Sequence, residues 1–171
     1  MFKNTLLLLA TAITVEASTL EKFNALVIVT HKDSGEYFVN IQSKTFAEDK
    51  SKVEHLGDKY FANAMTELKG KKIYQLRVRK SLITDIGLDA LKDFPSIKQL
   101  ELSNSKITDD GIKKIVEYCP QIERLNIWGC KNVTDKSLEY LRGLWKLEKL
   151  NLHGTKVTWD AANKHRGIMQ S

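Results

Sequence analysis

Apolar and polar residues alternate in four short segments in the second half of the chain, and these segments recur at a nearly fixed spacing. Their central leucines, Leu100, Leu125 and Leu150, are evenly spaced, and Leu76 precedes the first of them at nearly the same interval. Alternation with a period of two is typical of a strand that has one buried face. A fixed period of about 25 residues predicts units that stack on one another, because no single unit can bury its apolar face alone.

A helical pattern follows each of the first three alternating segments. Its inward positions are apolar and stand three residues apart: Leu88 and Leu91, Ile112 and Ile115, Leu138 and Leu141. A threonine and an aspartate precede each helix, at residues 84–85, 108–109 and 134–135, where either side chain can cap the free amides of the first turn. Strand and helix in regular alternation predict parallel strands joined by helical crossovers.

The segment before these units has a different pattern. Residues 25–30 and 36–41 are β-branched apolar runs, and Gly35 lies in the turn between them, so we expect a hairpin. From Asp49 to Leu68 apolar residues recur every three or four positions, which predicts a helix that Gly70 ends. We expect residues 18–70 to cap the first unit, and the alternative is a small independent N-terminal domain.

Residues 1–17 resemble a secretory signal peptide. Lys3 precedes an apolar run of about eleven residues, Thr5 to Val15, and Val15-Glu-Ala17 offers small or β-branched groups at the two positions that a signal peptidase inspects. The run is too short for a membrane span, which needs about 20 apolar residues. We therefore expect a secreted or periplasmic protein with no stable membrane span after cleavage. The alternatives are a helix packed on the end of the stack, or an N-terminus that is kept and places the chain in mitochondria or at an intracellular membrane.

Charge is distributed unevenly over the 171 residues. Residues 1–70 carry 8 Lys and Arg against 9 Asp and Glu, whereas residues 71–171 carry 19 against 12. A basic surface can favour acidic proteins, anionic membranes or nucleic acid. The cations are mixed with acids and form no long basic run, and few aromatic residues stand among them, so nucleic acid is not the expected partner.

The third unit resembles a known family. The stretch Gln121-Ile-Glu-Arg-Leu-Asn-Ile-Trp-Gly-Cys-Lys-Asn-Val-Thr-Asp135, with Cys119-Pro120 before it, is similar to the cysteine-containing class of leucine-rich repeats. Such repeats occur in the substrate-binding halves of F-box proteins, in a mitochondrial ATP synthase-associated subunit and in many bacterial proteins. In the neighbouring units Ser103-Asn104 and His153-Gly154 take the place of Gly129-Cys130. No F-box-like segment is present in residues 18–70.

The resemblance covers about residues 71–160 and implies a fold rather than an activity. It implies an α/β fold: a right-handed leucine-rich repeat solenoid of about four repeats, with a parallel concave sheet, convex helices and the N-terminal hairpin and helix as a cap. Residues 161–171 remain as a C-terminal tail. The loop between Leu125 and Thr134 is one residue longer than the loop between Leu100 and Thr108.

Strand alternation also predicts which side chains face outward from the concave sheet. Equivalent positions in neighbouring strands stand about 5 Å apart and form rows. The three rows are Gln75, Gln99, Arg124 and Lys149; Arg77, Glu101, Asn126 and Asn151; and Arg79, Ser103, Trp128 and His153. Trp and Arg are enriched among residues that dominate binding energy. We therefore predict a partner-binding surface made of Trp128, Arg124, Arg79, Arg77, Glu101, Asn126, His153 and Lys149. The alternative is that Trp128 folds over its neighbours or is covered by a terminal segment.

Two further features have structural interpretations. Cys119 and Cys130 have no histidine at a metal-ligand spacing, and they resemble the small core residues of the repeat class, with a disulfide between them as the alternative. Asn132-Val-Thr134 is a glycosylation sequon, but the repeat class favours the same residues for its loop and helix cap.

The sequence contains no phosphate loop, no His-Glu-x-x-His motif and no nucleophile elbow, and it suggests neither catalytic residues, nor a cofactor, nor a metal. The predicted function is a non-enzymatic protein–protein interaction module, expected to be a monomer, that binds another protein through the concave face. The alternative is an intracellular or mitochondrial assembly or scaffold factor that its hydrophobic N-terminus holds at a membrane or complex.

Overall fold

One six-stranded sheet runs through the part of the chain that a computed structural model describes, which is residues 25–31, 35–43, 57–79 and 81–169. The strands are β1 (Ala25–His31), β2 (Tyr37–Ser43), β3 (Ile73–Arg79), β4 (Gln99–Glu101), β5 (Arg124–Asn126) and β6 (Lys149–Asn151). The helices are α2 (Asp58–Glu67), η2 (Gly87–Asp93, a 3₁₀-helix), α3 (Asp109–Tyr118), α4 (Ser137–Leu141) and α5 (Trp159–Met169). The expected signal peptide, residues 1–17, lies outside the described residues.

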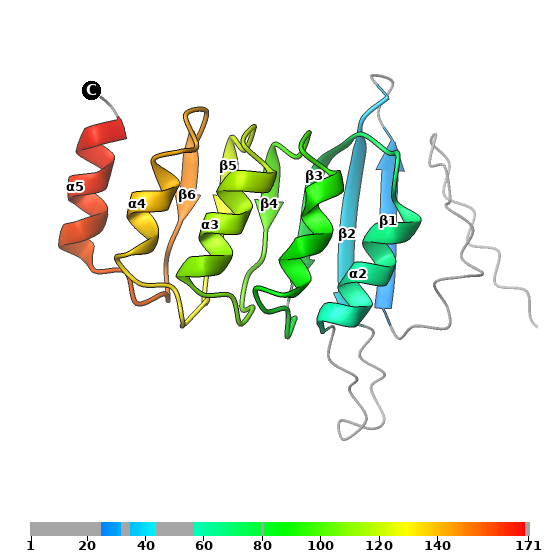
Figure 1. The fold of residues 1–171 in the computed structure, drawn as a ribbon, viewed down its shortest axis with the longest axis horizontal. Helices are drawn as coiled ribbons and strands as arrows, with labels where there is room; N and C mark the ends of the chain where they lie inside the picture. The colour runs from blue at the N-terminus through cyan, green and yellow to red at the C-terminus, as the bar shows by residue number, and fades with distance from the viewer. Residues whose placement is uncertain (1–24, 32–34, 44–56, 80, 170–171) are drawn as a thin grey trace, which may run out of the picture.

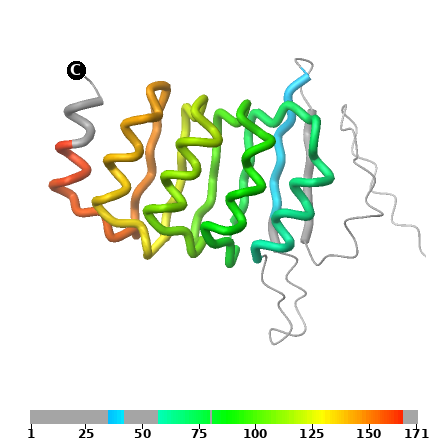
Figure 2. The backbone as a smooth tube through the Cα atoms, viewed as in Figure 1, coloured from blue at the N-terminus to red at the C-terminus, as the bar shows by residue number. Residues whose placement is uncertain are grey.

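The strands stand side by side in the order of the chain, β1 to β6 (Figures 1 and 2). β1 pairs with β2 in the antiparallel direction, which confirms the predicted hairpin, and Gly35 in its turn has φ +76°. The other neighbours pair in parallel, so β2 to β6 form a five-stranded parallel sheet with a helix after each strand. The hairpin therefore continues the same sheet as the later strands.

Parallel pairing places equivalent residues of successive strands next to one another. Leu76 pairs with Leu100, Leu100 with Leu125, and Leu125 with Leu150. The helices all lie in front of the sheet in the view of Figure 1, so they cover one of its faces. The leucines point to that face, where the inward residues predicted for the helices are also buried. Each such side chain contributes about 1.5–3 kcal/mol when fully buried, so this layer holds most of the apolar core.

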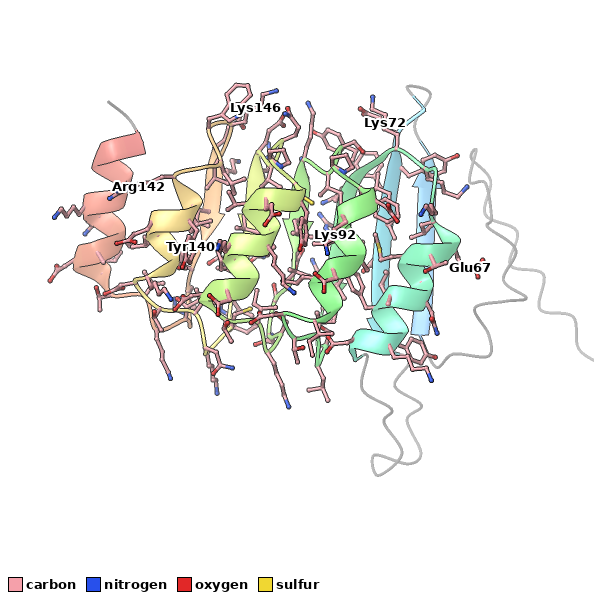
Figure 3. The ribbon with its side chains drawn as sticks, viewed as in Figure 1. Glu67, Lys72, Lys92, Tyr140, Arg142 and Lys146 are labelled. Carbon is pink, nitrogen blue, oxygen red and sulfur yellow. The ribbon has the colours of Figure 1, made fainter. Side chains whose placement is uncertain are left out.

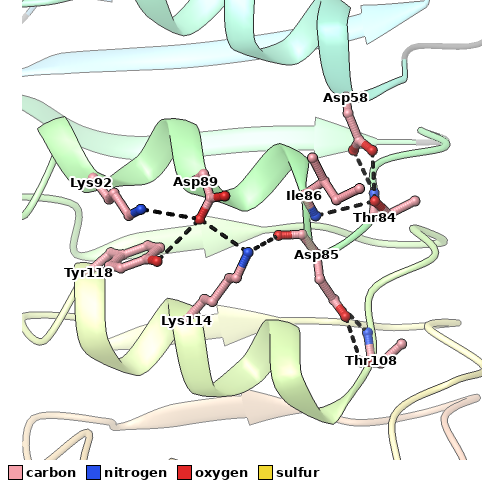
Figure 4. A network of polar contacts seen from close by, with 9 residues as sticks. All are labelled: Asp58, Thr84, Asp85, Ile86, Asp89, Lys92, Thr108, Lys114 and Tyr118. Atoms are coloured by element: carbon pink, nitrogen blue, oxygen red, sulfur yellow. Dashed lines mark hydrogen bonds and ion pairs between the residues drawn. The ribbon is translucent and has the colours of Figure 1, made fainter.

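A repeated contact joins each helix start to the next one along the stack. The carboxylate of Asp85 accepts hydrogen bonds from the backbone N–H of Thr108, at 2.9 Å, and from its hydroxyl, at 2.6 Å. Asp58 binds Thr84 in the same way, and Figure 4 shows both contacts. Asp109 with Thr134 and Asp135 with Thr158 complete the series. We call these four contacts the aspartate–threonine clamps.

The clamps differ from what the sequence led us to expect of the aspartates. The hydroxyl of Thr108 does cap its own helix, since Thr108 is the N-cap of α3 and its Oγ1 accepts from the N–H of Asp110 at 3.2 Å. The aspartate beside it instead reaches forward to the following unit. The backbone N–H and the hydroxyl of the threonine are both satisfied as a result. The hydroxyl donates to the aspartate of the preceding unit and accepts a hydrogen bond from its own unit.

The series of clamps has a defined start and end among the described residues. It starts at Asp58, the first residue of α2, so this helix is tied to the later units in the same way as they are tied to one another. It ends at Thr158, because Trp159 stands where the earlier units have aspartate. The longer loop of the third unit does not interrupt it: Asp109 still reaches Thr134, and Asn132 of that loop lies beside Thr108.

Polar contacts also bridge the helices η2 and α3 on their outer side (Figure 4). Lys114 donates to the backbone oxygen of Asp85 at 2.8 Å and lies 3.1 Å from the carboxylate of Asp89, to which the Tyr118 hydroxyl also donates. The hydrogen bond from Lys114 is the main cause that lowers the pKa of Asp89. The hydrogen bond from Tyr118 to Asp89 is exposed and adds little stability, whereas the clamps at Thr84, Thr108 and Thr134 are part-buried.

Several helices have other bounds than the apolar pattern of the sequence predicted. The described helix α2 begins at Asp58, and the first part of the predicted helix, residues 49–56, lies outside the described residues. The helix after β5 spans only five residues. α5 continues to Met169, through most of the segment expected as a tail. Tertiary packing sets these lengths, because each helix needs only to cover its own strand.

The loops after β4, β5 and β6 each turn at a residue with positive φ. Asn104, Gly129 and Gly154 have φ of 59°, 73° and 74°. This corrects the alignment of the loops by one residue: Gly129 matches Asn104 rather than Ser103, and Cys130 matches Ser105. Trp128 is therefore equivalent to Ser103 and His153, since Asn104 N–H donates to the oxygen of Trp128 and Gly129 N–H to that of His153.

Removing one clamp in the middle of the stack should destabilise the protein. Asp109→Ala leaves the N–H and hydroxyl of Thr134 without their acceptor, at a cost of about 1.5–3 kcal/mol, the usual value for hydrogen bonds to charged groups. Asp109→Asn keeps one acceptor and should cost less. Urea unfolding measures both, and Asp110→Ala is the matched control because that neighbouring aspartate is exposed and makes no clamp. Equal losses for Asp109→Ala and Asp110→Ala would contradict a special role for the clamp.

Candidate functional site

The sheet face opposite the helices carries the side chains predicted for partner binding. A shallow groove of about 200 Å³ runs across β3 to β6 on this face. Five of the eight predicted residues line it, namely Arg77, Glu101, Arg124, Asn126 and Lys149. No helix of the described residues lies on this side (Figure 1). We refer to this feature as the sheet-face groove.

Strand register places the predicted rows as the alternation indicated. Gln75 pairs with Gln99, Gln99 with Arg124, and Arg124 with Lys149. The next row pairs in the same way, Arg77 with Glu101, Glu101 with Asn126 and Asn126 with Asn151. These side chains come from segments that are far apart in the sequence, and the register brings them to neighbouring strands.

The third row is less uniform, since Arg79 is the last residue of β3 whereas Ser103, Trp128 and His153 follow their strands. Trp128 is 42% exposed, and a β-carbon at Gly154 would stand 3.9 Å from its Nε1, so the indole rests against the loop of the next unit while part of it faces solvent. His153 is exposed. Ser103 was expected to face outward, but it is only 6% exposed and its hydroxyl lies 3.3 Å from Glu101. The exposed side chains of this row are therefore those of Arg79, Trp128 and His153.

Trp128 and His153 follow their strands and so mark the carboxyl edge of the sheet. Figure 3 labels Lys72 and Lys146 at the opposite edge, where they precede β3 and β6. The exposed Trp145 belongs to that opposite edge, with the ammonium of Lys146 4.5 Å from its ring centre. The two tryptophans are thus on different edges and cannot form one contact patch.

Glu101 forms ion pairs with both arginines of β3, one carboxylate for two guanidinium groups. Its carboxylate accepts two hydrogen bonds from Arg79, at 2.6 and 3.1 Å, and lies 3.5 Å from the guanidinium of Arg77. The hydrogen bond and charge of Glu101 raise the pKa of Arg79 above its usual value. Glu101 is only 16% exposed as a side chain, whereas both arginines remain about half exposed. The two guanidinium groups are therefore accessible to a partner, but both are already paired with Glu101.

Arg124 and Lys149 differ from these arginines because their charges are not paired. Both side chains are exposed and line the groove, and within the described part of the chain neither takes part in a side-chain hydrogen bond or ion pair. They stand next to each other in the register of β5 and β6. The groove therefore has a paired cationic end over β3 and β4 and an unpaired cationic end over β5 and β6.

The sheet face also includes residues that the sequence reasoning did not assign to it. β2 pairs in parallel with β3, with Asn40 opposite Arg77, so the face extends over the hairpin. Phe38 and Tyr74 lie there with ring centres 5.4 Å apart. Alternation within residues 36–41, with Val39 and Ile41 buried, was the available signal, because it places Phe38 and Asn40 on the opposite face.

The cysteines are buried structural thiols, as predicted. Both are free and fully buried. Cys130 Sγ contacts the backbone oxygen of Leu102 and the hydroxyl of Ser105, each at 3.2 Å. Burial raises the pKa of Cys119 to about 12 and also raises the pKa of Cys130, so neither is poised as a nucleophile.

Among the residues that the structure describes, no cluster of three or more His, Cys, Asp and Glu could hold a metal ion. No helix within the described ranges is long and apolar enough to cross a membrane. Asn132 of the sequon is exposed, while the hydroxyl of Thr134 is engaged in its clamp. No protein-family model matches the chain.

The pairing of Arg79 with Glu101 should contribute measurably to folding. A double-mutant cycle of Arg79→Ala and Glu101→Ala, measured by urea unfolding, should give a coupling of about 0.5–1 kcal/mol, because the contact is bidentate but half exposed. Lys69 and Asp93 form the control pair, since they also meet at 3.0 Å but are 67% and 55% exposed. Their coupling should be near zero. A control coupling as large as that of Arg79 and Glu101 would show that the bidentate geometry is irrelevant.

Proposed function

We propose that this protein is a non-enzymatic interaction module that binds a partner protein through the sheet-face groove and the adjoining Trp128. The single observation that carries the proposal is the convergence of Arg77, Glu101, Arg124, Asn126 and Lys149 on one groove of a sheet face that no described helix covers. Cationic and amide side chains on a rigid sheet, with an aromatic residue at the rim, form the kind of surface that proteins use for recognition.

We also propose that the fold is a short leucine-rich repeat arc of the cysteine-containing class. The in-register strands, the equivalent left-handed positions at Asn104, Gly129 and Gly154, and the buried Cys130 are consistent with that class. The sheet face would then be the concave side, which repeat proteins present to their partners. Buried thiols and regular clamps serve this architecture and need no enzymatic explanation.

Trp128 supplies the apolar part of the proposed contact. Its indole is held on one side by the loop that contains Gly154 and is 42% exposed on the other. The N–H of Trp128 donates to Asn126 Oδ1 at 3.1 Å, which fixes the backbone that carries the ring. A preorganised aromatic side chain loses little conformational entropy on binding, which favours affinity.

Replacement of Trp128 should weaken partner binding more than it weakens the fold. The partner is captured from an extract of the native host, identified and purified, and its dissociation constant is then measured by calorimetry. Trp128→Ala should cost about 2 kcal/mol or more of binding free energy if the ring is a hot spot. The midpoint of urea unfolding should change little, because the ring is only partly buried.

Trp145→Ala is the matched control for this experiment, since Trp145 is 70% exposed on the other edge of the sheet. It should leave the dissociation constant unchanged. The proposal fails if Trp128→Ala and Trp145→Ala have the same effect on binding, or if Trp128→Ala lowers the unfolding midpoint strongly while binding is retained.

A further inference from the structure

Four neighbouring side chains on β5 and β6 present only hydrogen-bond donors to the sheet-face groove. Arg124 and Lys149 are unpaired cations, and each is followed two residues later by an asparagine that also lines the groove, Asn126 and Asn151. We call these four residues the donor cluster. The guanidinium and ammonium groups have no acceptor atoms at all.

The asparagines act as donors because their oxygens are already used. Asn126 Oδ1 accepts from the N–H of Trp128, and Asn151 Oδ1 accepts from the N–H of His153, each at 3.1 Å. These bonds orient both amides, so that the Nδ2 groups are the polar atoms left for a ligand. Neither Nδ2 group donates to any acceptor in the described part of the chain. Two amide donors therefore stand beside two cations.

The other end of the groove does not share this character. Glu101 supplies an anionic acceptor there, and it is occupied by Arg77 and Arg79. An incoming anion meets a carboxylate over β4 but only donors over β5 and β6. The groove is thus electrostatically polarised along the sheet, and its unsatisfied end is complementary to a group that carries negative charge and accepts hydrogen bonds.

We propose that the donor cluster binds a carboxylate side chain from an acidic, extended segment of the partner protein. This inference rests on the proposed function and specifies its chemistry. A carboxylate has two acceptor oxygens and no donor, and an arginine can bind it through two parallel hydrogen bonds. Arg124 and Lys149 stand on adjacent strands, about 5 Å apart, so one carboxylate can contact both.

A nucleic acid fits this end of the groove less well. Binding to single strands combines a positive track along the backbone with aromatic rings that stack on successive bases. The aromatic pair on this face, Phe38 and Tyr74, lies at the β2–β3 end rather than beside the donor cluster. Two unpaired cations next to Glu101 form no continuous track, so a protein carboxylate is the better match.

The probe for the inference is a short fluorescent peptide of alternating glutamate and alanine, with the glutamine–alanine peptide as its uncharged counterpart. Fluorescence anisotropy measures the binding of each to the full chain. The wild-type protein should bind the glutamate peptide, and its affinity should fall as salt is added. The double variant Arg124→Glu with Lys149→Glu should lose about tenfold or more in affinity, because two charge-assisted contacts become repulsive.

Two further variants make the result specific. Lys131→Glu with Lys156→Glu makes the same change in net charge at exposed loop positions outside the groove, and it should change the affinity less than about twofold because screening weakens distant charges. Asn126→Asp with Asn151→Asp keeps the acceptor oxygens that bind the backbone N–H groups and replaces both Nδ2 donors by anionic oxygens. This nearly isosteric pair should fold normally and should also lose the peptide.

Several results would overturn the inference. They are the absence of measurable binding of the glutamate peptide to the wild type, equal binding of the glutamine peptide, and equal losses in the groove and loop variants. Tighter binding of oligouridylate, lost in the same groove variants, would assign the donor cluster to nucleic acid instead. If these tests fail while Trp128→Ala still weakens binding of the captured partner, the proposed function stands and the acidic ligand does not.

Discussion

The fold depends on a contact that each unit makes with the next, the bond between an aspartate carboxylate and the amide and hydroxyl of the following threonine. Apolar burial alone would let neighbouring units slide or rotate, because hydrophobic contact is not directional. The clamps add direction: four carboxylates, from Asp58 to Asp135, each fix the start of the next helix. Together with the strand register they set one spacing for the whole stack.

The same spacing produces the candidate binding surface. A register that puts Leu125 beside Leu150 on the buried face also puts Arg124 beside Lys149 and Asn126 beside Asn151 on the open face. Asn126 contributes to both, since its Oδ1 accepts the hydrogen bond from Trp128 at the end of the strand and its amide nitrogen faces the groove. Binding chemistry and stacking are therefore coupled, and a change in unit spacing would disperse the donor cluster as well as weaken the core.

The sequence predicted the parallel strands, the buried faces of the helices and the rows of outward residues, because periodicity reports directly which side chains share a face. It did not predict the partners of the aspartates, because Asp85 and Thr108 belong to different units and neither side chain signals the other locally. The burial of Ser103 was missed for a related reason, because it depends on the backbone turn that follows β4. The pairing of Glu101 with two arginines likewise needed the register before it could be recognised.

Amide hydrogen exchange of the native protein tests most directly whether the clamps hold the units together. The N–H groups of Thr108 and Thr134 donate to carboxylates of the preceding unit, so they should exchange slowly, with the amides of the buried strands β4 and β5. The N–H of Thr158, at the end of the series, should exchange faster because terminal units open more readily. Exchange of Thr108 and Thr134 at the rate of an exposed loop amide, such as that of Lys131, would contradict the account.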